Sequence, residues 1–312
     1  MTTQSIAIPG AAFAAPSFRQ RLGSALPFLL LVPSLIATLV YVFVFTGWTV
    51  YISLSKSAMF PVATFGGTRA YTDLWANARW GIAYHNLFVY GVLYVVGATA
   101  IGLALAILID QRIRAESIWR TIFLYPLAVS FVVTGTVWGW LYSPDSGIQM
   151  LVRNLGWSNF NFALTASKDT AIYAIVITGI WQSSGFAMAL FLAGLRAVDP
   201  DIIKAAQIDG AGPFRTYARV ILPTIAPIFV AVLVVLLQFA IKTFDLVVAL
   251  TAGGPGLATT FPALYVYDMM FQRGQIAQGA AAAIMILAAL AVVLVPYALW
   301  LVWRHRRESR NV

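Results

Sequence analysis

Long stretches without a charged residue limit most strongly what this chain can fold into. Seven such stretches occur, at 22–55, 80–109, 121–144, 170–195, 220–241, 246–267 and 274–303. Each is long enough for a helix that crosses the hydrocarbon core of a bilayer, which takes roughly 20 apolar residues. Only 10% of the 312 residues are charged and 61% are hydrophobic, whereas soluble domains carry about a quarter charged residues. The sequence therefore predicts an all-α integral membrane protein.

One neutral stretch does not suit a membrane span. Residues 246–267 contain the run Thr-Ala-Gly-Gly-Pro-Gly at 251–256, which would break a helix and leave backbone groups unpaired in lipid. We interpret this stretch as the end of one helix followed by a loop. Six transmembrane helices remain, predicted at about 26–52, 86–109, 120–142, 170–194, 225–250 and 277–303.

The basic residues indicate the orientation of these spans. An even number of spans places both termini on one side, and cytoplasmic loops carry an excess of Lys and Arg. With the termini inside, 13 basic residues are cytoplasmic: Arg19, Arg21, Arg112, Arg114, Arg120, Arg196, Lys204, Arg215, Arg219, Arg304, Arg306, Arg307 and Arg310. Six are outside: Lys56, Arg69, Arg79, Arg153, Lys168 and Arg273. We therefore expect cytoplasmic termini, a mobile tail at 1–20 and one transmembrane domain at 21–312.

The same charge pattern and several missing motifs exclude other function classes. The net charge of +9 follows from the topology and needs no nucleic-acid partner. The chain has no cysteine, and none of its lysines follows a glycine, which excludes a cysteine metal site and a phosphate-binding G-x-x-x-x-G-K-[ST] loop. His85 and His305 fall on opposite sides of the membrane. We therefore expect neither an enzyme nor a metal site.

The cytoplasmic loop between spans four and five, residues 195–223, has strong local structure signals. Asp199 is a good N-cap, and Pro200 suits the first position of a helix. An apolar face follows at Ile202, Ile203, Ala206 and Ile208. Asp209-Gly210 is a turn signal, and Gly212-Pro213 can begin a second helix that leads to Pro223. The loop is predicted to be two short helices around a tight turn.

A pair of short helices in a cytoplasmic loop can have two functions. Its small residues, Ala205, Ala206, Gly210, Ala211 and Gly212, would allow another protein to approach closely. Alternatively, the helices could lie on the lipid headgroups. Physical reasoning from the residues leaves both possibilities open.

The amino-acid sequence of this loop resembles a motif of a known protein family. Lys204–Gly210 and Val220–Pro223 are similar to the EAA loop of binding-protein-dependent ABC importer permeases, in which E-A-A is followed by three residues, a glycine, nine residues and I-x-L-P. Phe244–Leu246 and Leu250–Pro255 resemble the carbohydrate branch, and specifically the larger membrane subunit of the maltose permease type. The resemblance covers about residues 181–272.

The resemblance implies a type I importer permease fold in the bacterial inner membrane and a set of partners. These are a second homologous permease, a dimer of ATPase subunits that holds ATP and Mg²⁺, and an extracytoplasmic solute-binding protein. The chain itself would bind no cofactor. Contact with the ATPase is expected at Lys204, Ala205, Ala206, Asp209, Gly210 and Ala211. The usual Glu is Lys at position 204, which would reverse an ion pair with the ATPase.

Polar residues inside two spans suggest where a sugar could pass, because such residues are costly in lipid. Gln182 and Phe186 lie one turn apart on span four, and the resemblance places Ser183 and Phe186 at sugar-contact positions. Gln238, Lys242 and Asp245 have the spacing of one helical face on span five. The alternative for span four is close helix packing, which Ser and Gly favour in membranes.

Lys242 and Asp245 are expected to neutralise each other, since either charge alone would cost about 2.5–3.5 kcal/mol at the bilayer centre. A second possibility is that Lys242 binds an anionic sugar. Together with the six predicted spans, the resemblance implies the permease subunit of an ATP-driven sugar, glycoside or polyol importer that works by alternating access. The alternatives are a self-sufficient secondary carrier, which inverted repeats would mark, and a membrane scaffold that conducts nothing.

Overall fold

The computed structural model describes residues 31–111 and 113–308, with the side chains at 304, 305, 307 and 308 left aside. The chain divides into two units, Met1–Tyr51 and Ile52–Val312. In the first, a helix is described from Leu31 onwards. It passes through a π-helical turn at Val40–Val44 and continues as α2 (Phe45–Ser53), whose last two residues belong to the second unit. The predicted tail at 1–20 lies outside the described residues.

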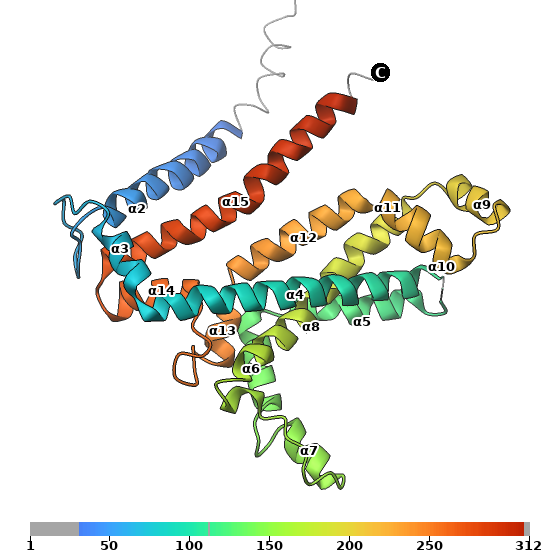
Figure 1. Ribbon diagram of the computed structural model, residues 1–312, viewed down its shortest axis with the longest axis horizontal. Coiled ribbons are helices and arrows are strands. Elements are labelled where there is room, and N and C mark those ends of the chain that lie inside the picture. Colours follow the sequence, from blue (N-terminus) through green and yellow to red (C-terminus); the bar gives the residue numbers. More distant parts are fainter. Residues whose placement is uncertain (1–30, 112, 309–312) are drawn as a thin grey trace, which may run out of the picture. The chain divides into compact units, whose positions relative to one another are not determined.

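In the part of the second unit that the structure describes, the regular elements are all helices joined by loops, and one isolated bridge joins Ser55 and Phe65. Its longer helices are α4 (Ala78–Asp110), α5 (Glu116–Ala128), α6 (Phe131–Leu141), α8 (Ala171–Arg196), α12 (Ala226–Ile241) and α15 (Ile276–Glu308) (Figure 1). Its shorter elements are α3 (Arg69–Ala76), α7 (Ile148–Asn154), η2 (Leu164–Ala166), α9 (Pro200–Ile208), α10 (Pro213–Thr216), η3 (Tyr217–Ile221), α11 (Leu222–Thr224), α13 (Asp245–Leu250), α14 (Pro262–Tyr267) and η4 (Asp268–Gln272).

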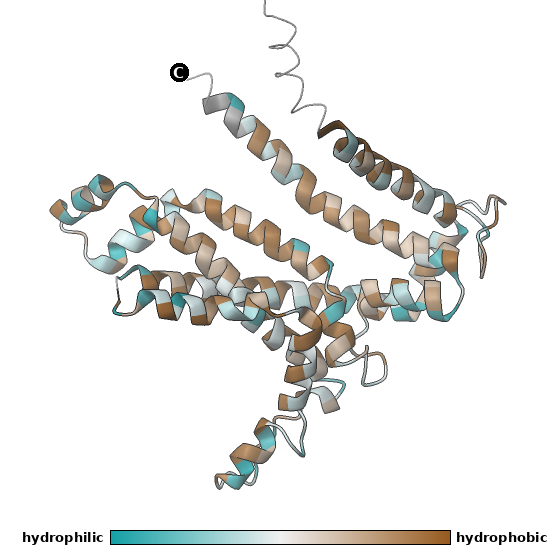
Figure 2. Ribbon diagram, turned by 180° about the vertical axis from the view of Figure 1, so that it is seen from behind, coloured by the Kyte–Doolittle hydropathy of each residue, from teal (hydrophilic) through white to brown (hydrophobic). Residues whose placement is uncertain are grey.

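Four of the predicted spans are single long helices. Among the described residues, Leu31–Ser53, Ala78–Asp110, Ala171–Arg196 and Ile276–Trp303 are long and apolar enough to cross a membrane, and two bent helix pairs raise the number to six if each is one span. Figure 2 shows hydrophobic residues along α12 and α15, with hydrophilic residues mostly at helix ends and in the short elements. The predicted all-α fold is confirmed, and the predicted number of six spans is reached if each bent pair is one span.

The third span differs from the prediction, because 120–142 is not one helix. Its two halves, α5 and α6, are bent by 100° at a short break. Pro126 inside α5 lacks an N–H, and Ser130 caps the new helix by accepting a hydrogen bond from the Val133 amide at 3.3 Å. We call Val129–Ser130 the span-three bend. It is tolerated in a membrane only where neighbouring groups satisfy the freed backbone.

The fifth span is also interrupted. The prediction of one helix at 225–250 is wrong, because α12 ends at Ile241 and α13 begins at Asp245. Phe244 between them has φ −129° and ψ −59°, outside the helical region. We call Lys242–Phe244 the span-five break. It removes the continuous helical face on which Gln238, Lys242 and Asp245 were expected to lie together.

The core of the second unit lies where α4 and α8 pack against each other. Tyr94 and Ala98 of α4, with Met188 and Phe191 of α8, are buried in one cluster. The helices are close because Gly102 lies against Ala187: a Cβ at position 102 would be 2.5 Å from that of Ala187. Such contacts between small residues are how helices associate tightly in membranes.

Candidate coupling loop and substrate pathway

The loop between α8 and α12 contains the two short helices that the sequence predicts. The carboxylate of Asp199 caps α9 by accepting a hydrogen bond from the Asp201 amide at 2.9 Å, and Pro200 is the first helical residue. The Lys204 ammonium donates to Asp201 at 2.9 Å, one turn back on the exposed side of the helix. The start of α9 is therefore held by groups within its own first turns.

The end of α9 is held in the same local way. Gly210 has φ +78°, which side chains disfavour and glycine accepts. The Gly210 amide donates to the Gln207 carbonyl at 3.1 Å, and the Ala211 amide donates to the Ala206 carbonyl at 3.0 Å. This is the pair of bonds of a Schellman ending. The predicted turn at Asp209-Gly210 is confirmed, and α10 begins at Pro213 as expected.

The outer side of this hairpin presents apolar and small residues. Ile208 and Phe214 are each 86% exposed, and Ile202 is 44% exposed. Ala205 and Gly210 are exposed as well, whereas Ala206 is buried at 9% and faces the rest of the unit. The predicted apolar face of α9 is therefore divided between an inner and an outer side. The outer residues form what we call the docking face: Ile202, Ala205, Ile208, Gly210 and Phe214.

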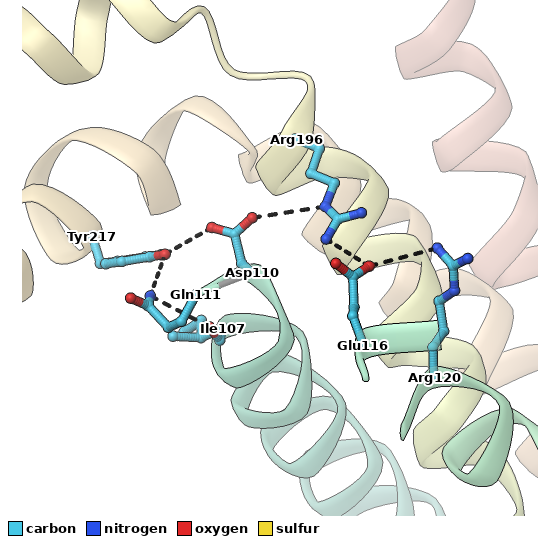
Figure 3. Close-up of polar contacts among 7 residues, drawn as sticks. All are labelled: Ile107, Asp110, Gln111, Glu116, Arg120, Arg196 and Tyr217. Atoms are coloured by element: carbon cyan, nitrogen blue, oxygen red, sulfur yellow. Dashed lines mark hydrogen bonds and ion pairs between the residues drawn. The ribbon is translucent and has the colours of Figure 1, made fainter. Parts of the chain in front are cut away.

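Both ends of the loop reach the end of α4 (Figure 3). The Tyr217 hydroxyl donates to Asp110 Oδ2 at 2.7 Å, and Gln111 Nε2 donates to the Tyr217 oxygen at 2.8 Å. On the other side, Arg196 Nε lies 4.0 Å from Asp110 Oδ1, and Arg196 Nη2 lies 2.8 Å from Glu116 Oε1. Helices α4, α5 and α8 thus meet the loop in one polar network.

The Tyr217 phenol is protonated in this network. Burial first, then the hydrogen bond to Asp110 and the charge of that carboxylate, raise the pKa of Tyr217 to about 12. At neutral pH the hydroxyl therefore acts as the donor and the Asp110 carboxylate as the acceptor.

A pocket of about 230 Å³ lies at the span-five break. It is lined by Phe131, Phe239, Lys242, Thr243, Phe244, Asp245 and Leu246. Phe186 of α8 contacts Phe239, with ring centroids 5.8 Å apart. The structure thus brings three of the predicted pathway residues, Phe186, Lys242 and Asp245, to one region. Gln238 is half-buried and does not line this pocket.

The other two predicted pathway residues have partners inside the chain. Gln182 is 2% exposed and its Nε2 donates to the Val129 carbonyl at 2.7 Å, at the span-three bend. Ser183 is 1% exposed and accepts a hydrogen bond from the Tyr94 hydroxyl at 2.7 Å. These contacts favour the packing alternative for span four, and a role for either residue in the pathway stays a prediction.

The expected pairing of Lys242 with Asp245 is wrong. Among the described residues no ion pair joins them, and the Lys242 ammonium has no hydrogen bond or ion pair. Both side chains are exposed on the second unit, whereas Ile241 and Leu246 beside them are buried. The physical reason is the span-five break, which turns the chain between the two residues.

Comparison with known proteins establishes the family. Residues 7–307 match the family model described as "Binding-protein-dependent transport system inner membrane component". The chain belongs to this family. It is therefore a multi-pass membrane permease of the ABC importer type and not an enzyme, as the EAA-like loop predicts.

Several named proteins are similar to this permease. It is 36% identical to a probable ABC transporter permease of Pyrococcus horikoshii, over 90% of this chain and 96% of that one. It is 35% identical to the xylose/arabinose import permease XacH of Haloferax volcanii, over 72% of each chain. It is 30% identical to the trehalose/maltose transport permease MalF of Thermococcus litoralis, over 78% of this chain and 82% of MalF.

A solved structure shares the fold. A chain of a bacterial ABC transporter that imports the acidic polysaccharide alginate superposes with a TM-score of 0.75 at 20% identity, covering 90% of this permease and 97% of that chain. The likeness confirms the type I importer permease fold.

The polar network was missed by sequence reasoning. Asp110 and Glu116 end one helix and begin the next, and Arg196 ends a third. Acidic residues at the ends of consecutive spans, next to an arginine at the end of another, are a usable signal for such a network. The sequence does not single out Tyr217, because nothing local to it shows that its hydroxyl reaches Asp110.

Proposed function

We propose that this permease is one of two membrane subunits of an ATP-driven, binding-protein-dependent sugar importer of the inner membrane. Its relatives include pentose and disaccharide import permeases. The observation that carries the coupling part of the proposal is the docking face, where Ile208 and Phe214 are exposed beside small residues. Large apolar side chains left in water on a rigid hairpin are characteristic of a protein interface.

The partners in this proposal are a second permease, an ATPase dimer that binds ATP and Mg²⁺, and an extracytoplasmic binding protein. A related alginate importer is known in complex with a periplasmic protein. The ATPase would receive the docking face of loop 199–220, with Lys204, Ala205, Ala206, Asp209, Gly210 and Ala211 at or beside the contact. Closure of the ATPase dimer would then move the loop and switch the spans between outward- and inward-facing states.

The sugar would meet the pocket at the span-five break. Phe186 and Phe239 offer aromatic faces, Lys242 offers donors and Asp245 offers acceptors for hydroxyl groups. Because Lys242 has no partner within the described chain, a water-filled path or an anionic substrate group would remove the cost of its charge. Gln182, Ser183 and Gln238 do not line this pocket, and they stay in the proposed pathway only as predictions from the sequence.

Copurification from native membranes tests the coupling proposal. The tagged permease should retain an ATPase and a second six-span protein in mild detergent, and Ile208→Asp with Phe214→Asp should abolish ATPase retention. Both side chains are 86% exposed, so the substitutions leave the fold intact. Leu155→Asp is the matched control, because Leu155 is 79% exposed and lies outside the coupling loop, and this variant should retain the ATPase.

Two results would contradict the proposal. Unchanged ATPase retention in the double variant would show that the docking face does not bind the ATPase. Sugar uptake by the purified chain alone would favour a secondary carrier.

The absence of cysteine allows a direct test of orientation. Single cysteines at Lys204 and Arg69, both exposed, should be labelled from opposite sides of the membrane by an impermeant maleimide. We expect the Lys204→Cys variant to react only from the cytoplasm. Reaction from outside would reverse the proposed placement of the termini.

A further inference from the structure

The two ends of the coupling loop converge on one carboxylate. Arg196 lies three residues before the cap of α9, and Tyr217 follows α10 at the far end of the hairpin. Asp110 Oδ2 accepts a hydrogen bond from Tyr217 at 2.7 Å, while Asp110 Oδ1 faces Arg196 at 4.0 Å (Figure 3). The two oxygens of one side chain therefore contact the segments that enter and leave the hairpin.

The contact extends across the next chain reversal. Arg196 also pairs with Glu116 at 2.8 Å, and Glu116 lies 3.9 Å from Arg120 on α5. The carboxylates of Asp110 and Glu116 are 22% and 26% exposed, so water screens them less than freely exposed charges. With Pro200 and Ile203 of α9 they line one pocket of about 670 Å³. The base of the hairpin thus rests on the charged ends of α4 and α5.

Asp110 lies at the end of α4, so the packing of α4 determines which helices move when the coupling loop pulls on this side chain. Helix α4 is packed against α8 through contacts such as Gly102 on Ala187, where no space remains for a side chain. Close-packed helices shift as units because their contacts do not compress. A displacement of the hairpin that reaches Asp110 therefore moves α4 and α8 together, whereas a hairpin detached from Asp110 would move alone.

We infer that Asp110 is a positioning residue for transport, which holds both ends of the coupling loop on the α4–α8 pair through Tyr217 and Arg196. The inference rests on the proposed function, because it requires an ATPase that moves the loop. Asp110 contacts neither substrate nor ATP in this role. Its effect is to convert ATPase closure into movement of the spans.

The test uses the assembled importer in proteoliposomes and three readouts: ATPase retained with the permease, ATP hydrolysed in the presence of loaded binding protein, and sugar taken up per ATP. We expect Asp110→Asn and Tyr217→Phe to retain the ATPase and hydrolyse ATP. Uptake per ATP should fall roughly tenfold in Asp110→Asn and less in Tyr217→Phe, within the roughly 5- to 150-fold range typical of coupling between sites. If both variants act on one contact, the double variant should be no worse than Asp110→Asn alone.

Controls separate coupling from folding and from the proposed function itself. Tyr71→Phe on α3 removes a hydroxyl that contacts the Ser53 hydroxyl at the end of α2 at 2.8 Å, and it should leave uptake per ATP unchanged. If the Asp110→Asn variant does not assemble, Tyr217→Phe tests the same contact, because it removes only the hydroxyl that donates to Asp110 and keeps the aromatic ring. Unchanged uptake per ATP, or parallel losses of retained ATPase, hydrolysis and uptake, would overturn the inference. Failure of the unsubstituted permease to retain an ATPase would instead overturn the proposed function.

Discussion

The coupling loop and the span-three bend are both interruptions of helical structure, but different interactions hold them. In the loop, the Asp199 carboxylate holds the start of α9 by accepting from an amide two residues away, and the Gly210 and Ala211 amides end the helix by donating to carbonyls of its last turn. At the bend, the free carbonyl of Val129 receives its hydrogen bond from Gln182, which is 53 residues away in sequence. Local chemistry determines the first interruption, and packing between helices determines the second.

This difference has a consequence for function. A hairpin held by its own residues keeps its shape when a partner pushes on it, which suits a coupling element. A bend held by a neighbouring helix depends on that helix, so movement of α8 would change the environment of α6. Substitutions that remove one kind of support and keep the other test this comparison.

Gly185→Ala should lower stability the most, because it disrupts the close packing of α5 against α8 near the span-three bend. A Cβ at this position would lie 2.0 Å from the Phe123 carbonyl oxygen, so α5 and α8 would have to separate. We expect a loss of about 3 kcal/mol or more, at the upper end for overpacked cores, measured as a lower thermal midpoint in detergent. Gly81→Ala on α4, where a Cβ meets nothing within 4 Å, is the control. Equal midpoints for the two variants would show that the bend is not supported by close packing.

Gly210→Val should act on the loop without loosening the spans. No atom lies within 4 Å of a Cβ at Gly210, so the effect comes only from its φ of +78°. That conformation costs side chains roughly 1–2 kcal/mol and β-branched ones more. We expect a clear loss of retained ATPase at an unchanged thermal midpoint. Gly212→Ala, at φ −68° and equally open, should retain the ATPase; if it loses the ATPase as well, glycine matters there for close approach and not for its conformation.

Gln182→Leu should weaken the bend by a smaller amount. The change leaves the half-buried Val129 carbonyl without its 2.7 Å hydrogen bond. An unsatisfied buried group costs about 1–3 kcal/mol, so we expect a loss near the lower end of that range. The measurement is again the thermal midpoint, and uptake per ATP is measured on the same preparation. Ser184→Ala, which removes only a 3.4 Å contact within α8, is the control. A variant with an unchanged midpoint but no uptake would mean that Gln182 contacts the sugar after all.

The same contrast explains which parts of the structure the sequence could predict. The spans follow from long apolar stretches, and α9 with its turn follows from Asp199, Pro200 and Gly210, whose preferences are local. The span-three bend was missed although Pro126 and Ser130 are visible signals, because a neighbour must also satisfy Val129. The contact of Tyr217 with Asp110 joins residues 107 apart. Only the packing of α4 beside the loop brings them together.

Lys204→Glu should have the smallest effect. It tests whether the ATPase binds the docking face through apolar surface complementarity or through charge. The Lys204–Asp201 bond joins side chains that are 69% and 82% exposed, and such surface pairs contribute little to stability. We therefore expect an unchanged thermal midpoint. If ATPase docking rests on Ile208, Phe214 and the small residues between them, retention should change by less than about twofold, the range of a screened surface charge. A large change would show that the ATPase carries a charge matched to Lys204, and that this permease and its ATPase recognise each other through a reversed ion pair.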